Sequence, residues 1–164
     1  MPRAFAVLGL LILGAFSVSR ADAAQSRAVL PTGDGSCDVT EPNKQAPPGI
    51  PPPAGIWHGN GDIWAGLWKD NTIIFKPGGP GFMHGDGSLE MKIYWVVRGP
   101  GPLTVEGRRL DAPSSPLIFT SGPRLDDGGN PSMVTFPSAG CWDVTAKANG
   151  SVLRFVTRVV RLAA

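Results

Sequence analysis

Two histidines in glycine-rich segments are the residues of this chain best suited to binding a metal ion. His58 lies in WHGNGD and His84 in MHGDG, and a carboxylate follows each of them, Asp62 and Asp86. Imidazole and carboxylate groups bind zinc, and imidazole also suits copper. If the two segments met, they would form a metal or small-ligand site. Nothing in the spacing fixes that approach, and Asp beside Gly is also ordinary turn chemistry. The sequence therefore favours two exposed loop histidines and predicts no metal.

Five tryptophans offer a second kind of chemistry, because an exposed indole ring can stack on a sugar. Trp57 stands beside His58 directly after a proline run, so we predict that it is exposed and is the candidate for ligand stacking. Trp64 and Trp142 lie at positions of expected strands that can point inward, and Trp95 lies in another expected strand. Large aromatic side chains dominate small cores, so we expect these three to be buried.

The segment VEGRRLD holds the acidic and basic groups that an enzyme would use. Glu106 and Arg108 share one face of an expected strand, where such a pair is a solvated ion pair of little energy. A glycosidase needs two carboxylates across a cleft, and Glu90, Glu106 and Asp111 are the available ones, but no insertion that would form a cleft is seen. A GxSxG elbow is also missing. The sequence predicts no catalytic residue, and a hydrolase is the least favoured interpretation.

The elements that must position these groups are strands, and the clearest is a hairpin over residues 136–161, FPSAGCWDVTAKANGSVLRFVTRVVR. Asn149-Gly150 separates two alternating runs, and these two residue types tolerate the positive φ angles of a type I′ turn. The turn sets the register, which pairs Ala148 with Ser151, Ala146 with Leu153, Val144 with Phe155, and Trp142 with Thr157.

The two faces of this hairpin differ in polarity because side chains alternate along a strand. One face is predicted to be buried and carries Trp142, Val144, Ala146, Leu153, Phe155 and Val159. The other is predicted to meet water and carries Asp143, Thr145, Lys147, Arg154 and Arg158. On that face Asp143 lies diagonally near Arg154 and Arg158, which predicts a cross-strand charge pair.

The pattern FPxxGCWxVT, a short turn and LxFVxxVV resembles a group of uncharacterised exported bacterial proteins. The resemblance extends back through LTVEGRRLDA to CDVTEPN at Cys37. The Pro and Gly before Trp142 also resemble the entry to the late strands of immunoglobulin-like sandwiches. The resemblance implies such a fold, and it implies no activity.

Residues 1–23 read as a secretory signal peptide, with Arg3 ahead of an apolar run over 4–18. Ala21-Asp22-Ala23 fits the small-x-small cleavage rule, which places the new N-terminus at Ala24. The alternative is a membrane anchor, but the apolar run is shorter than the roughly 20 residues that span a bilayer. We therefore predict a periplasmic or secreted protein.

The predicted export determines whether the two cysteines are expected to be free thiols or a disulfide. Cys37 and Cys141 are an even pair in an oxidising compartment, which favours a disulfide. The bridge would tie an N-terminal arm to the start of the final hairpin. The alternative of free or reactive thiols lacks support, because the chain has no CxxC.

Residues 24–55 form the arm, whose prolines at 47, 48 and 51–53 favour an extended conformation. Strands are predicted over 62–68, 72–76, 89–98, 103–110, 115–120 and 132–136, followed by the two of the hairpin. No window shows a helical apolar period. The prediction is an all-β protein, an antiparallel immunoglobulin-like β-sandwich of about eight strands over 56–164.

Composition limits the partners. The formal charge is +2, which gives no argument for binding nucleic acid. No cofactor motif is present, and no membrane span remains once the signal peptide is removed. The preferred hypothesis is therefore an exported module that binds an envelope protein or glycan, or that has a structural role there. The alternative is a metal- or small-ligand-binding protein that uses the loop histidines.

Overall fold

Strands make up nearly all of the regular structure. The computed structural model describes residues 37–50 and 56–163, so the predicted signal peptide lies outside the described residues. One 3-10 turn, η1 (Lys69–Asn71), is present among them. The strands are β1 (Ile56–Gly59), β2 (Ile63–Leu67), β3 (Thr72–Phe75), β4 (Phe82–Met83), β5 (Leu89–Val97), β6 (Thr104–Arg109), β7 (Ile118–Thr120), β8 (Gly129–Phe136), β9 (Gly140–Ala148) and β10 (Ser151–Arg161). The all-β prediction is confirmed.

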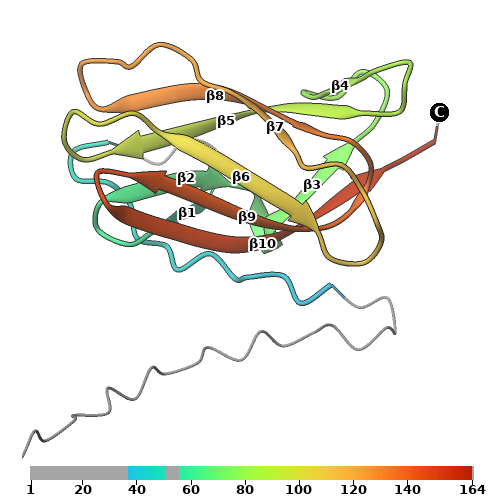
Figure 1. Ribbon diagram of the computed structural model, residues 1–164, viewed down its shortest axis with the longest axis horizontal. Helices are drawn as coiled ribbons and strands as arrows, with labels where there is room; N and C mark the ends of the chain where they lie inside the picture. The colour runs from blue at the N-terminus through green and yellow to red at the C-terminus, as the bar shows by residue number, and fades with distance from the viewer. Residues whose placement is uncertain (1–36, 51–55, 164) are drawn as a thin grey trace, which may run out of the picture. The chain divides into compact units, whose positions relative to one another are not determined.

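The strands form two sheets that face each other (Figure 1). The six-stranded sheet has the order β1-β2-β5-β8-β7, with β4 paired to β5, and the four-stranded sheet has the order β3-β10-β9-β6. Neighbours are antiparallel except β3 and β10, which run parallel. The short strands β1 and β4 were not among the predicted ones, because each lies in a segment rich in proline or glycine.

The β9–β10 hairpin has the predicted register in every pair, from Ala148 opposite Ser151 to Trp142 opposite Thr157. Asn149 and Gly150 take φ angles of 51° and 80°, as a type I′ turn requires. All six side chains predicted to be buried on this hairpin are buried. A slip of one residue would reverse the faces, so turn and pattern specify the same register.

The main core lies between the sheets and is built around Trp95, Trp142, Phe136 and Phe155. Trp142 contacts Phe136 edge to face, with 5.5 Å between ring centroids. Its Nε1–H also donates to the carbonyl oxygen of Ser138 at 3.1 Å, which satisfies the one polar group of the indole. The predictions of buried Trp95 and Trp142 are therefore confirmed.

A second apolar cluster joins Trp57, Trp64 and Val96, with the partly buried Tyr94 and Ile50 packed against it. Trp64 is buried as predicted, but in this smaller cluster and not in the main core. Trp57 is only 2% exposed, so the prediction that it is exposed is wrong. Strand β1 and the arm residue Ile50 place the ring inside the protein.

The described part of the arm runs past β10 (Figure 1) and bonds to both sheets, at a stretch of β10 that β3 does not cover and at the edge strand β1. Thr40 exchanges two hydrogen bonds with the backbone of Val156 in β10, both 2.9 Å long. Further along, the N–H of Lys44 donates to the carbonyl of Trp57 in β1 at 2.9 Å. The predicted disulfide between Cys37 and Cys141 is confirmed, and it fixes the start of this segment to β9. The arm therefore occupies unpaired stretches of strand that would otherwise be open to other chains.

Candidate binding groove

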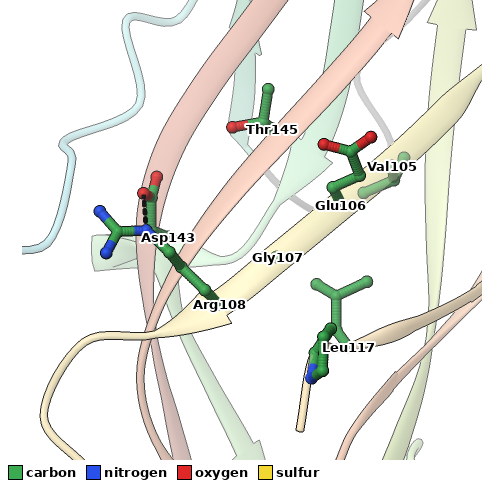
Figure 2. Close-up of a pocket in the computed structure, with 8 residues that line it drawn as sticks. Val105, Glu106, Gly107, Arg108, Leu117, Asp143 and Thr145 are labelled. Carbon is green, nitrogen blue, oxygen red and sulfur yellow. Dashed lines mark hydrogen bonds and ion pairs between the residues drawn. The ribbon is translucent and has the colours of Figure 1, made fainter. Parts of the chain in front are cut away.

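An open groove of about 460 Å³ lies at β6, on the edge of the four-stranded sheet. Two strands and the segment before β7 supply its walls. The lining residues are Val105, Glu106, Gly107, Arg108, Pro116, Leu117, Asp143 and Thr145. In Figure 2, Leu117 lies on the other side of β6 from Asp143 and Thr145. The groove therefore combines an apolar side with a polar side along one strand edge.

Gly107 determines how the apolar side is built. The N–H of Leu117 donates to the carbonyl of Gly107 at 3.1 Å, and the Leu117 side chain packs over this glycine. A Cβ at position 107 would lie 2.2 Å from Cδ2 of Leu117, so any larger residue would push Leu117 away. The close approach of a neighbouring segment is thus the reason for a glycine inside a strand.

Asp143 organises the polar side. Its carboxylate accepts hydrogen bonds from Nε of Arg154 at 2.7 Å and from Nε of Arg108 at 3.2 Å. The cross-strand pair with Arg154 is as predicted, whereas Arg158 instead donates to the carbonyl of Cys37. Asp143 was predicted to meet water, and this is wrong, because its side chain is only 5% exposed. The side chains of Arg108 and Arg154 cover it and remain 67% and 62% exposed, respectively.

The charge of Asp143 depends on these two arginines. Burial by itself would raise the pKa of the carboxyl group. The hydrogen bonds and positive charge of Arg154, and then of Arg108, act more strongly in the opposite direction and lower the pKa below its usual value. Asp143 therefore stays ionised, and one carboxylate neutralises only one of two arginines.

The ion pairs of β6 differ from those expected. Glu106 was predicted to pair with Arg108 two residues along the strand. Its carboxylate instead accepts from Nζ of Lys147 at 2.9 Å, while Arg108 contacts Asp143. Asp111, at the end of the same segment, binds Nε of Arg109 at 2.7 Å and accepts the N–H of Cys141. These bonds lower the pKa of Asp111 and give it a structural role beside the disulfide.

The two histidines lie in different parts of the protein. His58 is on β1, whereas His84 follows β4, and these strands lie well apart in Figure 1. His58 is buried, and its Nδ1 accepts the N–H of Asn43 at 3.3 Å. Burial lowers its pKa, partly offset by a hydrogen bond to the backbone of Arg154. The ring also packs edge to face on Phe155. Of the two predicted loop histidines, His58 is therefore a buried strand residue, and only His84 is exposed.

The acidic neighbours of the histidines do not complete a metal site. Asp86 accepts hydrogen bonds from the hydroxyl and the N–H of Ser88, which lower its pKa. Asp62 is an exposed residue between β1 and β2. Within residues 37–50 and 56–163, no group of three or more His, Cys, Asp or Glu side chains is arranged to hold a metal ion. In the same residues, no helix is long and apolar enough to cross a membrane.

The chain matches no protein-family model and no curated protein. The resemblance to exported bacterial proteins stays a prediction.

The acidic groups of the groove are paired with basic side chains. The lining of the groove contains one hydroxyl group, that of Thr145, and the carboxylates of Glu106 and Asp143. It contains no imidazole that could act as a base beside them. Asp143 is fully engaged by arginines, and Glu106 is held by Lys147. The exposed side chains of Arg108, in the lining, and of Arg154, which shares Asp143 with it, remain next to an apolar surface. Guanidinium groups are strong ligands for carboxylate and other planar anions.

Proposed function

We propose that this protein is an exported, non-enzymatic binding module with an immunoglobulin-like fold, and that its binding surface is the groove at β6. The observation that carries the proposal is the lining of that groove. Val105 and Leu117 provide an apolar surface, and the guanidinium group of Arg108 provides hydrogen-bond donors beside it. A few polar groups beside an apolar wall are typical of binding sites.

The strand order supports the immunoglobulin-like part of the proposal. Seven strands, taken in chain order as A to G, are β2, β5, β6, β7, β8, β9 and β10. They fall into the sheets as A-B-E-D and G-F-C, which is the immunoglobulin arrangement. Trp142, near the start of the F-equivalent strand, donates to the carbonyl of Ser138 four residues earlier. A tyrosine makes the corresponding corner in many such domains.

Export is supported by the disulfide. Cys37 and Cys141 are joined across 104 residues of chain, and such bridges persist in oxidising compartments. The predicted cleavage after Ala23 would leave the arm and the disulfide in the mature protein. We propose the periplasm or the cell exterior as the site of action, with an envelope protein or glycan as partner.

Site-specific photo-crosslinking in the producing cells tests this function. A photoreactive amino acid is placed at Thr145 in the groove, and in a second strain at Thr120 on the other sheet as the control. We expect a discrete crosslinked product from position 145, in the fraction outside the cytoplasm, that position 120 does not give. The same product should weaken when Arg108→Gln is added.

The result that would overturn the proposal is equally clear. If positions 145 and 120 give the same products, or if position 145 gives none, the groove is not a binding surface. If position 145 does give a specific product, mass spectrometry of that product distinguishes a protein partner from a glycan.

A further inference from the structure

We infer that the groove binds an extended peptide segment that carries an acidic side chain and pairs with the free edge of β6. The inference rests on the proposed function and adds the chemistry of the ligand. Two independent features of the groove support it, one in the backbone and one in the charges.

The backbone feature is an unoccupied position at the sheet edge. Peptide groups of alternate residues in an antiparallel strand point to opposite sides. Gly107 accepts the Leu117 N–H on the side of β6 that faces away from β9. Val105 is two residues earlier, so its N–H and C=O point to this same side. Within the described residues, no backbone hydrogen bond joins Val105 to another segment on that side. Such an edge accepts a further extended strand through two main-chain hydrogen bonds.

The edge at Val105 differs from the edges that the arm covers. Val156 of β10 is bonded to Thr40, and β1 is bonded to the arm through Lys44. The protein therefore covers these two stretches of strand with its own chain, whereas no described segment bonds to Val105 on the side away from β9, beside the groove. Open edges on soluble proteins are normally blocked, which makes an unpaired one next to a pocket a natural place for a partner strand.

The charge feature selects the ligand. The groove and its rim hold three cations, Arg108, Arg154 and Lys147, and two anions, Glu106 and Asp143, which leaves one net positive charge. Arg108 contacts Asp143 through Nε, so its two terminal NH₂ groups are free to donate to another acceptor. A carboxylate of the partner would neutralise this charge with a bidentate hydrogen bond. Pro116 and Leu117 would contact an adjacent apolar side chain.

Nuclear magnetic resonance on the isotopically labelled mature protein tests the inference with defined peptides. The probe is a synthetic ten-residue peptide in which valine alternates with glutamate. One matched peptide has glutamine in place of glutamate, and another has N-methylated valines, which remove the backbone donors. We expect the first peptide to shift the Val105 amide and the Arg108 Nε signals, with the affinity at least fivefold weaker for each of the other two.

Variants and a simple anion complete the test. Arg108→Gln should weaken the glutamate peptide at least fivefold, while Lys92→Gln, an exposed residue of β5 on the other sheet, should leave it unchanged. Equal binding of the glutamate and glutamine peptides would overturn the inference. So would equal binding of the N-methylated peptide, or sodium sulfate giving the same shifts, since that would indicate an anion site without strand pairing. If these controls fail while crosslinking from Thr145 still captures a partner, the proposed function stands and only the ligand chemistry is wrong.

Discussion

Asn43 of the arm pairs with both peptide groups of Gly59 in β1. Its side-chain Nδ2 donates to the Gly59 carbonyl at 2.6 Å, and its Oδ1 accepts the Gly59 N–H at 3.0 Å. One amide side chain thus takes the place of a neighbouring strand at this edge. The edge of β1 is closed by a single residue at this position.

Removal of that amide should loosen the arm. We expect Asn43→Ala to lower the free energy of unfolding by about 1–3 kcal/mol, because Gly59 is buried and would lose its partners. Gln45→Ala is the control, since Gln45 is exposed and bonds to Asn43 through its backbone. Urea unfolding and hydrogen exchange of the Gly59 amide measure the effect. Identical unfolding curves for the two variants would contradict this role of Asn43.

The burial of His58 predicts a pH dependence of stability. Its pKa in the folded protein is below the usual value of 6.5, so between those two pKa values the unfolded chain binds a proton that the folded protein does not. Stability should therefore fall as the pH drops below about 6.5, by at most about 1.4 kcal/mol per pH unit. His58→Gln should remove this component, whereas His84→Gln, at an exposed site, should keep it. Denaturation at a series of pH values checks it, and a profile equally steep in both variants would argue against it.

Asp143 should contribute in a more acidic range. Its folded pKa is lowered from 3.8, so its stabilising effect is complete above that pH and is lost as the pH falls through the folded pKa. We expect Asp143→Asn to lower the free energy of unfolding at pH 7 by about 1–3 kcal/mol and to flatten the profile below pH 3.8. The exposed Asp62→Asn serves as the control, measured by the same titrations. If both substitutions have the same effect, the two arginines do not stabilise the fold through Asp143.

The contact between Gly107 and Leu117 predicts a local change at the groove. Gly107→Ala places a methyl group against Leu117 and should cost about 1–3 kcal/mol, as overpacking does. Exchange of the Leu117 amide, whose acceptor is Gly107, should accelerate. Gly85→Ala is matched to it, because a Cβ there meets no atom within 4 Å. An unchanged Leu117 amide in Gly107→Ala would show that the loop accommodates the methyl group.

Local patterns were sufficient to predict the hairpin. The turn residues Asn149 and Gly150 are adjacent in sequence, and the alternation on both sides of them agrees with the turn, so neighbouring residues determine the register. The disulfide was predictable for another reason, since two cysteines allow only one intramolecular pairing. Burial of Trp142 followed from the same alternation, and burial of Trp95 from the preference of large aromatic side chains for small cores.

The residues of the groove depend on contacts between distant segments. Burial of Asp143 requires that β6 lie beside β9, with Arg108 opposite it in the ladder, and no turn joins those two strands. Leu117 gave no signal, because its role depends on the close approach to Gly107. Trp57 was predicted to be exposed because a proline run precedes it, yet Ile50 and Tyr94 pack around it. Two features of the sequence indicate the groove: Gly107 inside the VEGRRL strand, and Asp143 between the apolar residues Trp142 and Val144 in β9.

The position of β10 has a consequence for the order of synthesis. β10 follows every other described strand along the chain, yet it lies inside the four-stranded sheet, between β3 and β9. Until its residues have been made, β3 has no partner in that sheet, and Thr40 lacks the Val156 backbone that it binds. The four-stranded sheet therefore cannot assemble strand by strand during synthesis. It can be completed only after β10 has been synthesised. Loss of the last strand would remove the middle of the sheet, where loss of an edge strand would only narrow it.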